Sequence, residues 1–151
     1  MKKAFSLLEI IFVITVVALL GSLMLKNSYG FLEQAHITTL KAEVALIRNA
    51  LSVNKNQRIR KGLSEYPLVL DTAQLNHSHE MLFTGTPDEI LLTHPILATT
   101  TTQKEVGKFA KVSATKYYAY ITKDDYVEFV YNKNEGTFYC NYEHELCKEL
   151  D

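Results

Sequence analysis

The order of apolar and polar residues divides the chain into an unbroken apolar run, an amphipathic stretch and a region of alternating residues. Between Lys3 and Lys26, the only charged residue is Glu9. Three residues of this run are mildly polar: Ser6, Thr15 and Ser22. At about 1.5 Å of rise per residue, a helix over positions 4–25 is roughly 33 Å long, which is enough to cross the hydrocarbon core of a bilayer. Because a helix satisfies such hydroxyl groups internally, the pattern predicts a membrane helix over 5–26.

The stretch 27–56 predicts an amphipathic continuation of this helix. Its apolar residues recur at steps of three and four and form one stripe: Ile37, Leu40, Val44, Ile47 and Leu51. Proline first occurs at Pro67, and Gly30 is the one nearby residue that disfavours a helix. We therefore expect a single helix of about 50 residues, roughly 75 Å long. Its first half is apolar all round, and the stripe on its second half is expected to pack against a globular head.

The last third of the chain predicts an antiparallel sheet. Three runs are rich in aromatic and β-branched residues: 116–122, 126–131 and 136–140. The polar segments 123–125 and 132–136 are hairpin connections, so we expect the three strands to form a meander. Alternation in the middle run places Val127, Phe129 and Tyr131 on one face, which we expect to cover the stripe of the helix.

The residues between the helix and the sheet carry weaker signals. The segment 66–70 is predicted to dock on the rest of the head. Thr86 as a cap and Pro87 in the first turn, with two acids beside them, predict a brief helix over 86–92. The four threonines at 99–102 predict a polar loop or a short edge strand.

Glu9 is the anomaly of the apolar run. A carboxylate deep in such a helix costs about 2.5–3.5 kcal/mol on insertion scales, and less if it reaches the membrane interface. One interpretation is that Glu9 lies close enough to the lipid headgroups to stay hydrated. The other is that a cation from another molecule pairs with it, because a paired anion is tolerable where an isolated one is costly.

The start of the chain resembles the class III signal of type IV pilins and of the pseudopilins of type II secretion. The resemblance rests on one unit, which an apolar helix follows: Lys2-Lys3-Ala4, then Phe5-Ser6-Leu7-Leu8-Glu9. It implies that a prepilin peptidase cuts between Ala4 and Phe5 and methylates the new amino terminus at Phe5. It also implies that Glu9 neutralises the amine of a neighbouring subunit during assembly. Ala4 stands where most members carry glycine, and the proline that many carry near the end of the membrane segment is missing.

For the whole chain, the resemblance implies an α+β, type IV pilin-like fold, with the long helix packed on a small antiparallel sheet and a C-terminal disulfide loop. The expected parts are a leader over 1–4, a transmembrane and filament-core helix over 5–26, and a periplasmic head over 27–151. The implied function is that of a structural subunit, cleaved, N-methylated and assembled into a type IV pilus or a type II secretion-type pseudopilus. The implied partners are the prepilin peptidase, other copies and related pilin subunits in a filament, and an inner-membrane assembly platform; no cofactor is implied.

The charges around the apolar run predict its orientation. Lys2 and Lys3 precede the run and no such pair directly follows it, so the positive-inside rule places the amino terminus in the cytoplasm. We expect a single-pass protein of the bacterial inner membrane with a periplasmic head, which joins a periplasmic or cell-surface filament after assembly. A cleavable secretory signal shares the basic start, but no small-x-small cleavage motif follows Leu25. The formal charge of −1 gives no strong overall attraction to nucleic acid.

The two cysteines agree with an exported head. A lone close pair such as Cys140 and Cys147 is expected to be oxidised outside the cytoplasm. Two thiols alone make a poor metal site, and their spacing does not fit a C-x-x-C redox pair. We expect a structural disulfide that attaches the tail to the edge strand, as in the C-terminal loop of pilins, and that contributes about 2.5 kcal/mol by chain entropy.

Four basic residues near the end of the predicted helix are candidate DNA contacts: Lys55, Arg58, Arg60 and Lys61. One interpretation is that these cations complement the carboxyl end of the helix, which Gly62 terminates. The alternative is a phosphate-contacting patch on a minor tip subunit of a DNA-uptake filament. No aromatic residue is interleaved with the patch, so stacking on single strands is not supported.

No common catalytic motif occurs, neither G-x-S-x-G nor H-E-x-x-H nor a P-loop, which disfavours a membrane-anchored periplasmic enzyme. Three histidines invite a metal hypothesis: His77, His79 and His94. No free thiol or well-spaced carboxylate accompanies them, so we interpret them as solvated loop residues. Asp124 and Asp125 lack the Asp- and Gly-rich loop that holds calcium in the major pseudopilin of type II secretion. No catalytic or metal-binding residue is therefore assigned.

Overall fold

The computed structural model describes residues 7–150, and for 23–31 it describes the backbone alone. Its helices and strands follow in this order: α1 (Leu7–Arg60), β1 (Met81–Leu82), β2 (Gly85–Thr86), β3 (Glu89–Ile90), β4 (Ile96–Leu97), β5 (Phe109–Lys111), β6 (Lys116–Tyr120), β7 (Tyr126–Asn132), β8 (Thr137–Cys140) and α2 (Glu145–Leu150). The chain divides into two compact units, Met1–Ala35 and His36–Asp151. Each unit is described by itself.

The second unit is built on the carboxyl-terminal half of α1. The five residues of the predicted stripe are all buried there, which confirms the amphipathic pattern: Ile37, Leu40, Val44, Ile47 and Leu51. The helix ends in a Schellman motif, in which Leu63 N–H donates to the Arg58 carbonyl and Gly62 N–H to the Ile59 carbonyl. Gly62 has φ 70°, a conformation that glycine adopts without strain. The sequence signals for both the stripe and the helix end are thus confirmed.

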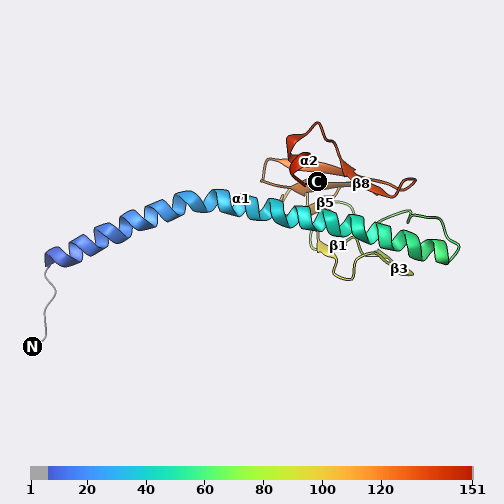
Figure 1. The fold of residues 1–151 in the computed structure, drawn as a ribbon, viewed down its shortest axis with the longest axis horizontal. Coiled ribbons are helices and arrows are strands. Elements are labelled where there is room, and N and C mark those ends of the chain that lie inside the picture. Colours follow the sequence, from blue (N-terminus) through green and yellow to red (C-terminus); the bar gives the residue numbers. More distant parts are fainter. Residues whose placement is uncertain (1–6, 151) are drawn as a thin grey trace, which may run out of the picture. The chain divides into compact units, whose positions relative to one another are not determined.

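A four-stranded antiparallel sheet, in the order β5-β6-β7-β8, covers this stripe (Figure 1). The predicted meander is confirmed as β6–β8, and β5 is an additional strand that sequence analysis missed. In β7, Val127, Phe129 and Tyr131 are buried while Tyr126 is exposed, as the alternation predicted. The result is one layer of sheet on one face of α1.

Aromatic rings fill the space between the sheet and the loop segments that precede it. Phe129 and Phe138, on neighbouring strands, stack with ring centroids 4.9 Å apart. Phe83, which lies between β1 and β2, packs edge-on against Phe109 at 5.6 Å and lies 4.7 Å from the ring of Tyr117. The region between the helix and the sheet therefore contributes to the core itself.

Two small antiparallel pairs, β1 with β4 and β2 with β3, organise this intermediate region. The predicted helix over 86–92 is wrong, because β2 and β3 form a hairpin with Pro87 and Asp88 in its turn. Gly85 makes the hairpin feasible: its φ is 82°, and a Cβ there would meet the Glu89 carbonyl oxygen at 2.1 Å. The predicted docking of 66–70 is confirmed, since the hydroxyl of Tyr131 donates to the Pro67 carbonyl at 2.7 Å.

The observed architecture is mixed helix and antiparallel sheet with a disulfide between Cys140 and Cys147. The α+β class is therefore confirmed. The short α2 at the end of the chain was not predicted.

Candidate functional site

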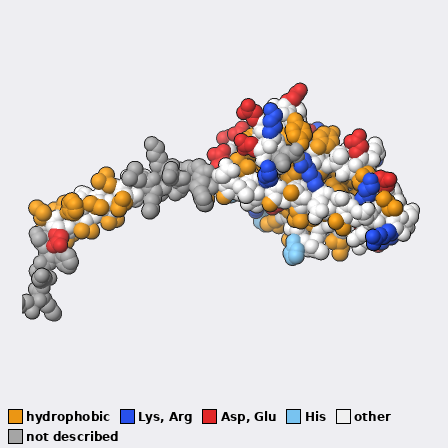
Figure 2. Space-filling view, in the orientation of Figure 1, with side chains coloured by type: hydrophobic (Ala, Val, Ile, Leu, Met, Phe, Trp, Pro, Cys, Tyr) orange, Lys and Arg blue, Asp and Glu red, His pale blue; other side chains and the backbone are white. Residues whose placement is uncertain are grey.

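The described side chains of the first unit form an apolar surface around the amino-terminal half of α1. From 7 to 22, large hydrophobic side chains are exposed at successive positions: Leu7, Leu8, Ile10, Ile11, Phe12, Val13, Ile14, Val16, Val17, Leu19 and Leu20. Successive positions differ by 100° around a helix, so this surface encircles it. Figure 2 shows hydrophobic side chains over the visible face of the stretch. Exposed apolar surface of this extent is typical of a segment that a membrane or a partner covers.

The polar groups of this stretch are satisfied within the helix. The Thr15 hydroxyl donates to the carbonyl of Phe12 at 2.8 Å, and the Ser22 hydroxyl to that of Leu19 at 2.8 Å. The expectation that the helix satisfies these hydroxyls internally is confirmed. Among the residues that the structure describes, no helical segment is both long and apolar enough to cross a membrane.

Glu9 lies in the first turns of α1, beside Ile10, Val13 and Ile14. No cation or hydrogen-bond donor from the described part of the chain contacts its carboxylate. The predicted cleavage site, Ala4 and Phe5, and the predicted methylation at Phe5 lie outside the described residues. Cleavage, methylation and the assembly role of Glu9 stay predictions.

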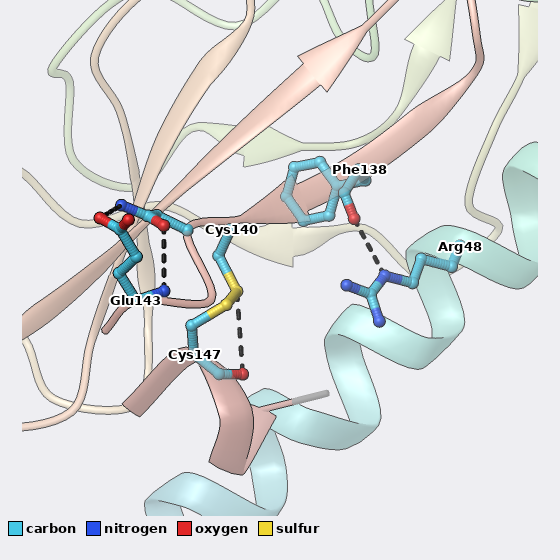
Figure 3. The surroundings of a disulfide bond; sticks show 6 residues. Arg48, Phe138, Cys140, Glu143 and Cys147 are labelled. Carbon is cyan, nitrogen blue, oxygen red and sulfur yellow. Dashed lines mark hydrogen bonds between the residues drawn. A yellow bond between two sulfur atoms is a disulfide. The ribbon is translucent and has the colours of Figure 1, made fainter. Parts of the chain in front are cut away.

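The disulfide between Cys140 and Cys147 is confirmed, with their Cα atoms 5.8 Å apart (Figure 3). It joins the last strand, β8, to α2, whose Leu150 is buried in the core. A second link lies close by, where Arg48 Nε of α1 donates to the Phe138 carbonyl of β8 at 2.9 Å. The tail is therefore attached to the edge strand, as expected, and that strand is attached to α1.

The four basic residues near the end of α1 do not form one exposed patch. Arg58 is buried, forms an ion pair with Glu89 and donates from Nε to the Ser64 carbonyl at 2.7 Å. Lys55 Nζ lies 3.1 Å from Glu65 Oε2 and 2.9 Å from the Tyr66 hydroxyl. Arg60 and Lys61 are exposed.

Arg58 thus holds the residues after α1 and the β2–β3 hairpin against the helix. This role was not predicted from the sequence, because its partners lie far along the chain. With Arg58 and Lys55 in internal contacts, the arrangement does not favour a DNA-binding patch.

His77, His79 and His94 lie exposed in the loops around β1 and β4. The His77 imidazole is 3.6 Å from the Glu80 carboxylate, and within residues 7–150 no three metal-ligating side chains converge. Asp124 and Asp125 lie in the turn between β6 and β7, where Asp125 accepts a hydrogen bond from the Thr122 hydroxyl.

Sequence analysis missed a buried ion pair that joins the region after α1 to the sheet. Lys111 Nζ donates to Asp71 Oδ1 at 2.7 Å and to the Ala73 carbonyl at 2.9 Å. Asp71 Oδ2 accepts from the Tyr117 hydroxyl at 2.8 Å and from Phe83 N–H at 3.1 Å. Burial, and then the nearby Asp71 carboxylate, raises the pKa of the Tyr117 hydroxyl, which therefore stays protonated and donates. Because every member has a partner, this cluster is a structural one.

Glu43 is a half-buried acid beside the stripe of α1. Its Oε2 atom is buried and has no hydrogen-bond partner in the described part of the protein. Burial raises the pKa of this carboxyl to about 7. Glu43 therefore changes charge near neutral pH.

Comparison of the chain with protein-family models, with curated proteins and with solved structures finds no match.

Proposed function

We propose that the chain is a prepilin-like structural subunit, which is anchored in the bacterial inner membrane, cleaved before Phe5, N-methylated there and assembled into a type IV pilus or a type II secretion-type pseudopilus. The observation that carries the proposal is the apolar run with a single carboxylate, Glu9, five residues after the predicted cleavage site. The basic leader and the small Ala4 before Phe5 support the same assignment.

Two properties of the described chain support a mechanical role. The exposed apolar surface of 7–22 needs lipid or neighbouring helices to cover it, and its hydroxyls are satisfied within the helix. The second unit combines one face of α1, a small sheet and a disulfide, which suits a head that stays folded outside the cytoplasm.

In the proposed mechanism, the subunit waits in the membrane and then moves into a filament, where apolar helices pack together. Glu9 accepts the positive charge of a neighbour's amino terminus, since an unpaired carboxylate in an apolar filament core is costly. No chemical step is required of the head.

The proposal is tested by replacing Glu9→Ala in the full-length chain, in cells that carry the assembly machinery. The precursor is processed normally, whereas incorporation into filaments, measured on sheared filament fractions, is strongly reduced. Ser22→Ala is the matched control: it removes another polar group of the apolar run, one already bonded within the helix, and leaves incorporation unchanged. Normal incorporation of the Glu9→Ala variant would contradict the pairing role.

A further inference from the structure

A groove of about 530 Å³ runs along the second unit between α1 and residues 87–93. Its walls carry apolar side chains that are exposed for their size: Leu46 is 46%, Val53 49% and Ile90 67% exposed. Asp88 and Glu89 add acidic groups to the hairpin wall. All of these residues belong to one compact unit.

Two acceptor atoms in this groove have no donor. Asn54 lines it, is 3% exposed, and its Oδ1 atom is buried without a hydrogen-bond partner in the described protein. Glu89 uses Oε2 for its ion pair with Arg58, while its Oε1 is buried and unpartnered. Buried acceptors are nearly always satisfied, so the groove is suited to an occupant that brings hydrogen-bond donors together with apolar surface.

The same chain carries a surface of this chemistry at the end of α1. Ile59 is 50% and Leu63 52% exposed, and Arg60 lies between them in the sequence. The Arg60 guanidinium makes no hydrogen bond or ion pair with any residue that the structure describes, and Arg60 does not line the groove of its own copy. A guanidinium has five N–H donors and no acceptor, which complements two unmet oxygens and an acidic wall. We call Ile59, Arg60 and Leu63 the basic tip.

We propose that the groove of one copy receives the basic tip of the next copy, with Arg60 donating to Asn54 Oδ1 and Glu89 Oε1. This inference rests on the proposed function, because anchoring in one membrane makes the helices of the two copies parallel. Residue 60 of one helix then lies level with residue 54 of the other, an axial shift of six residues or roughly 9 Å. Groove and tip are different surfaces, so the contact repeats from copy to copy and builds an open assembly.

Cysteine crosslinking in the full-length chain tests this contact. Arg60→Cys and Ile90→Cys are made separately and together, expressed with the assembly machinery and treated with a short thiol-specific crosslinker. The chain with both cysteines gives a ladder of multimers, a mixture of the two single variants gives dimers, and each single variant alone stays monomeric. Dimers from one single variant alone would indicate a symmetric contact and overturn the proposal.

Charge reversal provides the second arm, which does not depend on crosslinking. Arg60→Glu lowers incorporation into filaments at least roughly tenfold, and the added change Asp88→Lys restores it. Lys123→Glu, a reversal at an exposed lysine in the turn between β6 and β7, leaves incorporation unchanged. Normal incorporation of Arg60→Glu would overturn the proposal.

The amino terminus is checked in the same samples to separate this proposal from the proposed function. If Phe5 is N-methylated and filaments form, but neither ladder nor charge rescue appears, the groove contact alone is wrong. If the chain stays unprocessed and monomeric, both proposals are wrong.

Discussion

The half-buried carboxyl of Glu43 opposes folding when it is ionised. Its pKa is raised from 4.5 to about 7 in the folded protein, so between these values the folded state holds a proton that the unfolded state has lost. Stability therefore falls as the pH rises through this window. A shift of this size corresponds to at most about 3 kcal/mol, and solvent screening of a partly exposed group reduces it to about 1–2 kcal/mol.

Glu43→Gln is accordingly expected to stabilise the protein by about 1–2 kcal/mol at pH 8 and by much less at pH 5. Glutamine keeps the size of the side chain and carries no charge at either pH. Urea denaturation of both full-length proteins in detergent micelles, followed by circular dichroism, measures the difference. A constant difference across this pH range would show that Glu43 does not titrate with the raised pKa.

Two glycines with similar backbone conformations offer a matched comparison. Gly136 has φ 66°, and a Cβ there would meet ring atoms of Tyr66 at 2.0 Å, whereas Gly62, with φ 70°, has nothing within 4 Å. Gly62→Ala should cost only the left-handed conformation, about 1–2 kcal/mol. Gly136→Ala should cost more, because it also displaces Tyr66 from the loop after α1 and from its contact with Lys55. Equal losses in urea denaturation would contradict the close approach of Tyr66.

At the scale of elements, the sequence predicted those whose signals are local. The stripe from Ile37 to Leu51 repeats over several turns, and the alternation in β7 covers the whole strand, so both were found. The segment 86–92 was misassigned because a proline followed by an acid fits a helix start and a turn equally well. What decides for the hairpin is Gly85 and the ion pair of Glu89 with Arg58, 31 residues away.

The same limit applies to the structural clusters and the groove. Asp71, Lys111 and Tyr117 come together from three distant segments, and no spacing in the sequence relates them. The groove depends on where the hairpin lies against α1, so its unmet acceptors are visible only in the folded chain. The disulfide was predictable because it joins the two cysteines of the chain across a short loop.

The disulfide should contribute about 2.5 kcal/mol to the stability of the second unit. Replacing both residues, Cys140→Ser and Cys147→Ser, is expected to lower the free energy of unfolding by this amount and to free α2, whose Leu150 is buried. The wild-type protein should lose the same stability in a thiol reductant, while the double variant is its own control and should not respond. A wild-type protein that reductant leaves unchanged, although both thiols are shown to be reduced, would contradict this contribution.

At the scale of the whole molecule, the chain combines two units with different surfaces. The first presents apolar side chains around α1 and a single carboxylate, and the second buries its apolar stripe under a sheet. A protein that folds its head independently and leaves its amino-terminal helix for lipid and for sister helices can pass from a membrane into a filament. The interpretation of the whole chain therefore depends on what happens at its amino terminus.

The most direct test is mass spectrometry of the intact protein and of its amino-terminal peptide, purified from cells that possess the prepilin peptidase. We expect a chain that has lost Met1–Ala4, begins at Phe5 and carries one methyl group on the Phe5 amine. A chain that still begins at Met1 in those cells, or that has been cut after the apolar run, would contradict the proposed function.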